Sequence, residues 1–436
     1  MTMYNVLSFC KNLLNIIFVH IIFFFDFKNY LISKKILKIL VKRDMYIVFL
    51  QTNAFGFFQT QIDYLNKYCT EKNIDKKKVL LICPSKGNVF YFNKVKEHFS
   101  ILINKKIFNY YINKKKLINH LLKRMIITPT DCANYLPNIK FTINFTDEEN
   151  KFGLECLSKL GFKSLKKIVV ISYKSWTYHS KVMNQTYVGE DYRISDPKNF
   201  KKTLEYLKIN GYQIIISNVL NRDENEIFKE YPKLDYFNNN IEVRRFLEFY
   251  IYKICEFAIV GASGDQFVPK IFNKLALYHN AIIPHTFSEG VYLPKKILDN
   301  KTKNVLSLKN FMKKKYFMAH LDHMIIKLIY HSPIYFRSDK LFLRQNIYLE
   351  ENSPDEILEA TKELISYVQN RKISLSEEEE KLQLQIKEIY FNGFNIYKPN
   401  NKKYYKSMED KKSLDAIPMG GYISLNFLKK NKKFVI

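Results

Sequence analysis

The segment 256–272, EFAIVGASGDQFVPKIF, constrains the fold more than any other part of this chain. Its apolar run breaks at Gly261 and resumes with helical spacing, which predicts a strand, a tight turn and a helix. Gly261 and Gly264 let the backbone bend, and the small Ala262 and Ser263 leave room for a ligand. Unpaired N–H groups and the helix dipole at such a turn favour an anion. The segment therefore predicts a phosphate-binding turn, although any strand-to-helix turn of an α/β protein can use Gly and a capping Ser.

Apolar runs in the first half of the chain alternate with helical spacing. The runs that predict strands are 45–50, 79–83 and 125–128. This alternation is typical of a mostly parallel sheet, whose ligands bind at the carboxyl ends of the strands. Asn53, Gly56 and Asp131 fall at such ends, and Asn53 and Gly56 are candidate acceptor-binding residues. Each is also an ordinary loop residue.

The second half repeats the α/β pattern. Thr146-Asp-Glu-Glu149 is a capping box that opens a helix, and Asp196-Pro197 starts another with Pro at its first position. The predicted strands are 168–172, 212–216 and the run before Gly261, with a helix from Glu242 to Cys255. We therefore expect a second nucleotide-binding-type unit.

The length of 436 residues indicates two domains with extensions. We expect an N-terminal segment, a first and a second Rossmann-like domain, and a helical tail that packs back across the domains, at residues 1–43, 44–145, 146–371 and 372–436. The tail follows a helix that the Ser353-Pro-Asp-Glu356 capping box opens.

The formal net charge is +28. Such a charge suits nucleic acid, an anionic membrane or an acidic substrate. The abundance of Lys, Asn, Ile, Phe and Tyr is also what an AT-rich genome gives to every protein that it encodes. The chain has no interleaved basic and aromatic motif of a known nucleic-acid reader, so we predict no nucleic-acid partner. The six cysteines show no regular pairing and indicate thiols of a reducing compartment.

The N-terminal stretch Leu13–Phe25 is nearly all apolar and is followed by the basic KKILKILVKR segment. It is shorter than the roughly 20 apolar residues of a spanning helix. We favour an interfacial helix on the cytoplasmic leaflet, held by apolar contacts and by attraction of Lys and Arg to anionic lipid. A spanning helix, a cleaved signal peptide and a buried helix are the alternatives.

Four blocks occur in the order found in a family of bacterial surface-carbohydrate glycosyltransferases, which this chain resembles from about residue 44 to its end. They are DYRISDPKNFKKTLEYLKINGYQIIIS, EFAIVGASGDQFVPKIFNK, ENSPDEILEATKELI and GGYISLNFLKKN. The resemblance implies a two-domain GT-B architecture. It also implies a sugar donor bound chiefly to the second domain and an acceptor bound to the first.

Two basic groups of that family pattern are missing. Relatives carry a His-x-Arg-Asp-like tetrad after the strand that here ends Ile171-Ser172, where Lys174 replaces the guanidinium. The strand ending Ile216-Ser217 lacks the Arg often found there. A lysine neutralises phosphate as a point charge, without the bidentate fork of arginine. These losses favour the alternative of a catalytically degenerate relative that binds a nucleotide-sugar or glycan without turnover.

A sugar transferase must stabilise the departing nucleoside diphosphate and take a proton from the acceptor hydroxyl. The first task suits fixed N–H donors and cations. The candidate donor-binding residues are Lys174, Arg193, Ser217, Gly261, Ser263, Gly264, Asp265 and Gln266, of which Asp265 and Gln266 suit ribose or sugar hydroxyls. The second task suits a carboxylate near its operating pH, for which Asp131 and then Asp191 are the candidates.

A metal site is not expected. No DxD pattern follows a predicted strand, and the residues around His320, His323 and His331 are rich in apolar side chains, which favours a packed helix face. We therefore predict a metal-independent hexosyl or related transferase without a cofactor. It would move a sugar from a nucleotide-sugar to a surface-polysaccharide or lipid-linked acceptor at the cytoplasmic side of the inner membrane.

Overall fold

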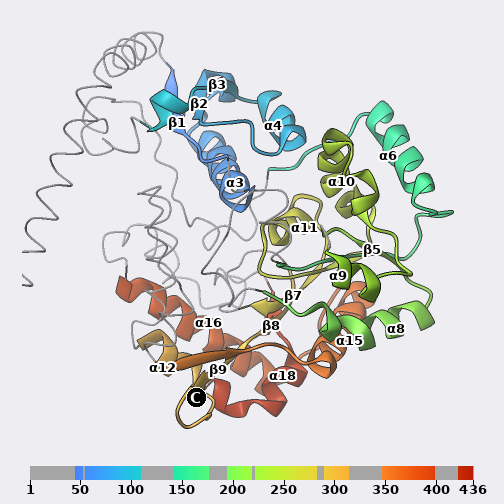
Figure 1. Ribbon diagram of the computed structural model, residues 1–436. Coiled ribbons are helices and arrows are strands. Elements are labelled where there is room, and N and C mark those ends of the chain that lie inside the picture. Colours follow the sequence, from blue (N-terminus) through green and yellow to red (C-terminus); the bar gives the residue numbers. More distant parts are fainter. Residues whose placement is uncertain are drawn as a thin grey trace, which may run out of the picture. The chain divides into compact units, whose positions relative to one another are not determined.

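The computed structural model is an α/β protein with parallel sheets (Figure 1). It describes residues 45–52, 55–109, 141–175, 194–218, 221–281, 289–313, 346–397 and 421–435. The chain divides into two compact units. Unit 1 comprises residues 1–53, 68–87 and 91–129, and unit 2 comprises residues 54–67, 88–90 and 130–436.

Unit 1 contains a parallel sheet of three strands in the order β1-β2-β3. The strands are Tyr46–Phe49, Val79–Cys83 and Ser100–Ile103. All five residues of β2 are buried, as expected for the middle strand of a covered sheet. The predicted strands at 45–50 and 79–83 are confirmed. The third strand, Ser100–Ile103, was not predicted, and residues 125–128 and Asp131 lie outside the described residues.

Unit 2 contains a six-stranded sheet in the order β11-β8-β7-β6-β4-β5, in which every neighbouring pair is parallel. Its strands, in chain order, are β4 (Ile168–Ser172), β5 (Gln213–Ile216), β6 (Phe257–Val260), β7 (Ala276–Ala281), β8 (Gly290–Pro294) and β11 (Tyr422–Ile423). A separate antiparallel pair joins β9 (Lys296–Asp299) and β10 (Ile347–Glu350). Burial of β4 and β6 along their whole length shows that helices cover both faces of the sheet.

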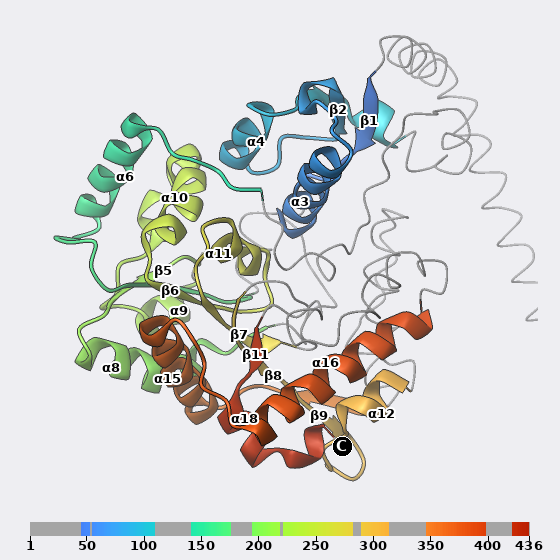
Figure 2. The same cartoon turned by 180° about the vertical axis from the view of Figure 1, so that it is seen from behind.

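Helices α10 (Ile241–Ile254) and α11 (Val268–Ile271) lie on one side of this sheet, and α8 (Lys201–Ile209) and α15 (Pro354–Asn370) lie on the other (Figures 1 and 2). The remaining elements are α3 (Phe55–Glu71), η1 (Lys76–Lys78), α4 (Val89–Lys96), α6 (Asp147–Lys159), η4 (Pro197–Phe200), α9 (Arg222–Ile227), η5 (Leu234–Phe237), η6 (Gly264–Phe267), α12 (Leu308–Lys313), α16 (Glu377–Tyr397), α18 (Leu425–Lys430) and η9 (Lys432–Phe434). The two helical layers enclose the core of unit 2.

The helix starts predicted from capping residues are confirmed. Thr146 and Ser353 each form a reciprocal capping box with a glutamate three residues later, at the starts of α6 and α15. The Asp196 side chain accepts a hydrogen bond from the N–H of Lys198 at the start of η4, where Pro197 occupies the first position. These caps are local interactions and could therefore be found from sequence spacing.

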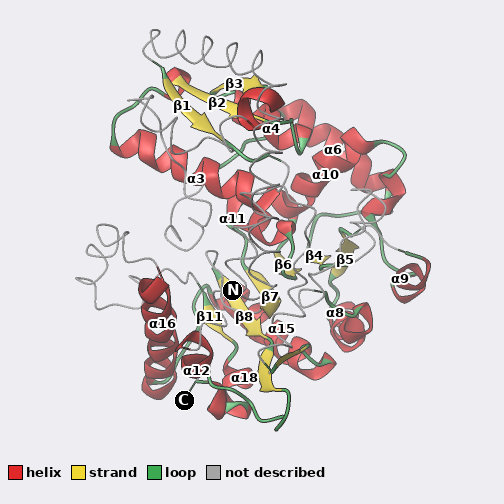
Figure 3. Cartoon of the chain, turned by 60° about the vertical axis from the view of Figure 1, so that its left-hand side comes forward, coloured by secondary structure: helices red, strands yellow, loops and turns green. Residues whose placement is uncertain are grey.

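Residues 421–435 form β11, α18 and η9 within unit 2 (Figure 3). Two polar side chains of α15 and α16 hold this segment. Gln383 of α16 exchanges two hydrogen bonds with the backbone of Ile423, of 2.7 and 3.0 Å. The Glu363 carboxylate of α15 accepts from the Ser424 hydroxyl and from the backbone N–H groups of Leu425 and Asn426, at 2.8–3.0 Å. These contacts hold β11 beside β8 and place a carboxylate at the start of α18.

Replacing Glu363 with alanine is expected to loosen this segment. The substitution leaves a hydroxyl and two N–H groups without their acceptor, which costs about 1–3 kcal/mol. Hydrogen exchange of the Leu425 and Asn426 amides should accelerate while exchange in β4 stays unchanged. Glu359→Ala on the same helix removes an ion pair with Lys362 at 2.8 Å between partly exposed side chains. Equal acceleration in this control would contradict the assignment.

Among the described residues, no helix is long and apolar enough to cross a membrane. The predicted interfacial segment 1–43 lies outside the described residues. The domain boundaries inferred from the sequence stay predictions.

Candidate anion-binding site

The carboxyl ends of β4, β5, β6, β7 and β8 share one edge of the unit 2 sheet, because all these strands are parallel. Lys174, Ser217, the turn 261–266 and Lys295 follow β4, β5, β6 and β8, and Asn280 lies near the end of β7. Open α/β sheets bind ligands at this edge. The fold therefore gathers the described donor-site candidates of unit 2 on one side of the sheet.

The turn after β6 is built by close packing. A Cβ atom on Gly261 would lie 3.1 Å from both Nε2 of His279 and Cα of Tyr173, so only glycine fits without a shift. Neither Gly261 nor Gly264 has a positive φ angle, and a Cβ on Gly264 would find its nearest atom at 3.7 Å. Neither glycine is therefore required by a left-handed backbone conformation. Close approach explains Gly261, and Gly264 has ordinary space around it.

Gly261→Ala is expected to lower the free energy of unfolding by about 1–3 kcal/mol, the usual cost of overpacking. Its added methyl must push the Tyr173 backbone or the His279 ring away. Gly264→Ala is the matched control, with no contact closer than 3.7 Å. Urea unfolding of the two variants checks the difference, and equal losses of stability would refute the packing explanation.

Ser263 is the N-cap residue of η6, but its side chain makes no capping hydrogen bond. Its buried hydroxyl has no hydrogen-bond partner among the described residues, and the same holds for the hydroxyl of Ser175 after β4. Buried hydroxyls are nearly always paired in folded proteins. Two unpaired hydroxyls at one sheet edge, together with the N–H groups that begin η6, suit the oxygen atoms of an anionic ligand.

Asp265 turns its carboxylate toward the sheet. Its Oδ2 accepts hydrogen bonds from the hydroxyls of Ser172 at 2.7 Å and Ser217 at 3.3 Å. Burial raises the pKa of Asp265 and the Glu248 charge adds to that shift, while the two serine hydroxyls and Arg244 oppose it. Asp265 therefore joins the turn to the ends of β4 and β5.

Arg244 supports this cluster from α10. Its guanidinium, buried with only 3% of the side chain exposed, donates to the Ser217 carbonyl at 3.1 Å. It also binds Asp235 at 3.0 Å and the Asn238 side chain at 2.7 Å. The segment that carries Ser217 is consequently held by a paired and hydrogen-bonded charge.

His279 at the end of β7 is buried against Phe200, with ring centroids 4.9 Å apart in an edge-to-face arrangement. Burial lowers its pKa to about 3, and the Lys295 charge contributes to that shift, so the imidazole is neutral. Neither ring nitrogen has a hydrogen-bond partner within the described part of the chain. The ring serves the turn by packing against Gly261.

The structure separates the predicted site residues into two groups. Lys174, Ser217, Gly261, Ser263, Gly264, Asp265 and Gln266 are described and lie in segments at the carboxyl edge. Gly56 is in the first turn of α3, where a Cβ would lie 2.5 Å from the Phe267 ring. Asn53, Asp131, Asp191 and Arg193 lie outside the described residues.

Sequence reasoning missed several buried polar residues of this edge. Asn280 and Asn352 exchange backbone-to-side-chain hydrogen bonds of 2.6 and 2.8 Å, and Asn280 also donates to the Ser195 hydroxyl at 2.9 Å. Lys295 is almost fully buried, with 1% of its surface exposed. The sequence signal for Lys295 is a lysine pair inside the apolar run VYLPKKIL. The asparagines have no comparable signal, because their partners lie far away in the sequence.

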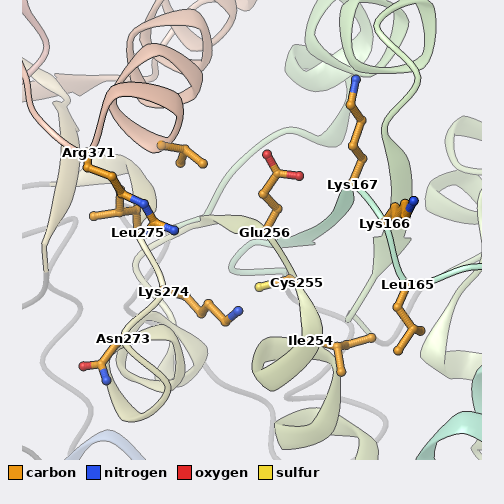
Figure 4. Close-up of a pocket in the computed structure, with 11 residues that line it drawn as sticks. Leu165, Lys166, Lys167, Ile254, Cys255, Glu256, Asn273, Lys274, Leu275 and Arg371 are labelled. Carbon is orange, nitrogen blue, oxygen red and sulfur yellow. The ribbon is translucent and has the colours of Figure 1, made fainter.

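A cavity of about 460 Å³ lies at the opposite edge of the sheet, at the amino ends of β4, β6 and β7 (Figure 4). Lys274 and Arg371 extend toward it, whereas Lys167 points away and donates to the Asn210 carbonyl beyond the end of α8. Helices α10 and α15 end beside this cavity, and cations are stabilised at helix C-termini. Its basic lining therefore has a structural explanation and is separate from the donor-site candidates.

No group of three or more His, Cys, Asp or Glu side chains that could hold a metal ion occurs among the described residues. His320, His323 and His331 lie outside them.

No family model matches the sequence, and no curated protein is significantly similar to it. Several solved structures show similarity to this chain at low TM-scores. One is a family 9 glycosyl transferase from Veillonella parvula, with a TM-score of 0.42 and 10% identity over 74% of this chain and 98% of that one. Another is E. coli ADP-heptose LPS heptosyltransferase II, with a TM-score of 0.36 and 10% identity over 56% and 90%. The wall teichoic acid polymerase TagF matches with a TM-score of 0.23 and 11% identity over 86% and 96%.

Proposed function

We propose that this protein is a glycosyltransferase of GT-B architecture that uses a nucleotide-sugar donor. The observation that carries the proposal is the carboxyl edge of the unit 2 sheet. This edge carries the first N–H groups of η6 and the buried hydroxyls of Ser175 and Ser263, which have no hydrogen-bond partner among the described residues. The four sequence blocks shared with surface-carbohydrate glycosyltransferases support the same function.

The proposed chemistry has two parts, departure of the nucleoside diphosphate and attack by the acceptor hydroxyl. A departing nucleoside diphosphate gains negative charge, which fixed N–H donors and the cations of Lys174 and Arg193 would stabilise. Asp131 or Asp191 would take the proton from the acceptor hydroxyl. In this scheme backbone N–H groups and basic side chains would supply the positive field.

The acceptor we propose is a surface polysaccharide or a lipid-linked glycan, reached from the cytoplasmic face of the membrane. The apolar stretch Leu13–Phe25 and the basic residues after it support this location, because apolar and cationic groups together bind anionic bilayers.

The direct test is calorimetric binding of nucleoside diphosphates and nucleotide-sugars to the full chain in mild detergent. Gly264→Trp should abolish binding, because the indole fills the space before η6, and Arg193→Ala should weaken it. Ile209→Trp is the control, since Ile209 is 84% exposed on α8. A folded protein that binds no member of the panel would refute the donor site.

An assay of sugar transfer distinguishes an active glycosyltransferase from a catalytically degenerate relative, the alternative that the two missing arginines favour. The nucleotide that binds selects the sugar donors for an assay of transfer to isolated lipid-linked glycans. Lys174→Arg restores the guanidinium after β4 and should raise turnover of a weakened enzyme. If wild type and Lys174→Arg both bind the donor tightly and neither transfers the sugar, the protein is a catalytically degenerate binder.

A further inference from the structure

Lys295 is a buried cation that forms no ion pair within the described part of the chain. Only 1% of its surface is exposed, and its ammonium makes one long hydrogen bond, of 3.4 Å, to the carbonyl of Ile194. No described carboxylate forms an ion pair with it. The neighbouring Lys296, by contrast, pairs with Glu350 at 2.8 Å and Glu356 at 3.1 Å. A buried charge with so little compensation is costly and needs an explanation.

A continuous series of contacts joins Lys295 to the turn after β6. Gly261 packs against Tyr173, and the carbonyl of the next residue, Lys174, accepts the N–H of Ser195 at 3.1 Å. Ile194, the residue before Ser195, accepts the hydrogen bond from Lys295. The N–H of Lys295 itself donates to the Ala281 carbonyl at the end of β7, at 2.8 Å. The ammonium therefore belongs to the same carboxyl edge as the proposed donor site.

We propose that the ammonium of Lys295 is a cationic ligand for the diphosphate of the nucleotide-sugar donor. This inference rests on the proposed function and names a residue that the sequence motifs did not. Phosphate oxygens would replace the long hydrogen bond to Ile194 with charge-assisted ones. Burial supports the role, because a cation shielded from water attracts an anion more strongly.

The competing explanation is that Lys295 braces the loop before η4. Glu351 accepts the Asp196 N–H at 3.0 Å and stabilises the charge of Lys295 from beyond ion-pair distance. The two roles predict opposite effects of removing the Lys295 charge on the melting temperature. Removing a brace lowers the melting temperature, whereas removing an uncompensated buried charge raises it.

The experiment measures calorimetric affinity for ADP, UDP and inorganic pyrophosphate, and the melting temperature without ligand, for the full chain in mild detergent. Lys295→Met keeps the length of the side chain and removes its charge. We expect affinity to fall about 10- to 100-fold, the usual worth of a hydrogen bond to a charged group, and the melting temperature to rise. Lys296→Met is the matched control and should leave affinity unchanged.

Each other result has a definite meaning. Unchanged affinity in Lys295→Met overturns the inference and leaves the proposed function standing. Lost affinity together with a lower melting temperature assigns Lys295 to bracing the loop and also overturns the inference. Pyrophosphate binding that depends on Lys295, without nucleotide binding, keeps the anion ligand and refutes the nucleotide-sugar donor. A wild-type protein that binds none of the three probes refutes both.

Discussion

Lys270→Met is expected to lower the free energy of unfolding by about 3–5 kcal/mol, the cost of breaking a buried ion pair by removing one of its members. Within unit 2, the Lys270 ammonium of α11 lies 3.2 Å from Oδ2 of Asp63 in α3, and the two side chains are only 8% and 5% exposed. The other carboxylate oxygen of Asp63 accepts the Phe141 N–H at 2.6 Å. Urea unfolding gives the loss directly.

Two further variants show whether the broken buried ion pair is the cause. Adding Asp63→Asn to Lys270→Met removes both charges and keeps an acceptor for the Phe141 N–H, so most of the lost stability should return. Lys208→Met breaks a shorter ion pair, 2.6 Å from Glu230, but both side chains are more than 60% exposed. Its expected effect on the free energy of unfolding is small, because water screens exposed charges. A similar loss in Lys208→Met and Lys270→Met would show that burial is not decisive.

Lys295→Met is expected to stabilise the protein near neutral pH and to lose this advantage in alkali. Burial lowers the pKa of Lys295 from 10.5 to about 8, with Glu351 opposing the shift and His279 neutral beside it. Below pH 8 the lysine is protonated in both the folded and the unfolded state, so the fold bears the full cost of the buried charge, about 3 kcal/mol. Between pH 8 and 10.5 the folded lysine loses its proton first, and the wild type gains stability relative to the variant.

The measurement is the difference in free energy of unfolding between wild type and Lys295→Met across pH 7–11. Taking the difference cancels the tyrosines and other lysines that titrate in the same range. Lys296→Met should show no such trend, because its ion pairs raise the pKa of Lys296 and burial alone opposes them. A pH-independent difference for Lys295→Met would mean that its pKa is not lowered.

The second unit could be predicted from sequence where its signals are local. The capping boxes at Thr146 and Ser353 and the proline after Asp196 each place a helix start correctly. The edge strand β11 could not be predicted, because it has only two paired residues. Their partners, Val291 and Tyr292 in β8, lie far away in the sequence. Likewise Ser100–Ile103 is half-exposed and lacks the continuous apolar run that marks a buried strand.

The turn after β6 could be predicted from the sequence, but the interactions of its side chains could not. The 261–266 segment is a turn after a buried strand, as its glycines indicate, but close packing of Tyr173 and His279 is the reason for Gly261. The engagement of Asp265 with Ser172 and Ser217 joins residues 93 and 48 positions apart. Burial of Lys295 is equally tertiary in origin. Such contacts become visible only when the strands are placed side by side.

The position of β11 has a consequence for how the protein is made. Strand β8 ends at Pro294, and the residues that pair with its free side are Tyr422 and Ile423, so roughly 130 residues are synthesised between the two. Throughout this interval on the ribosome, the edge of β8 offers unpaired backbone groups, which are a template for association with other chains. A chain that stops between residues 400 and 421 would keep the other five strands of the unit 2 sheet and leave β8 without its partner β11, and we expect such a chain to aggregate.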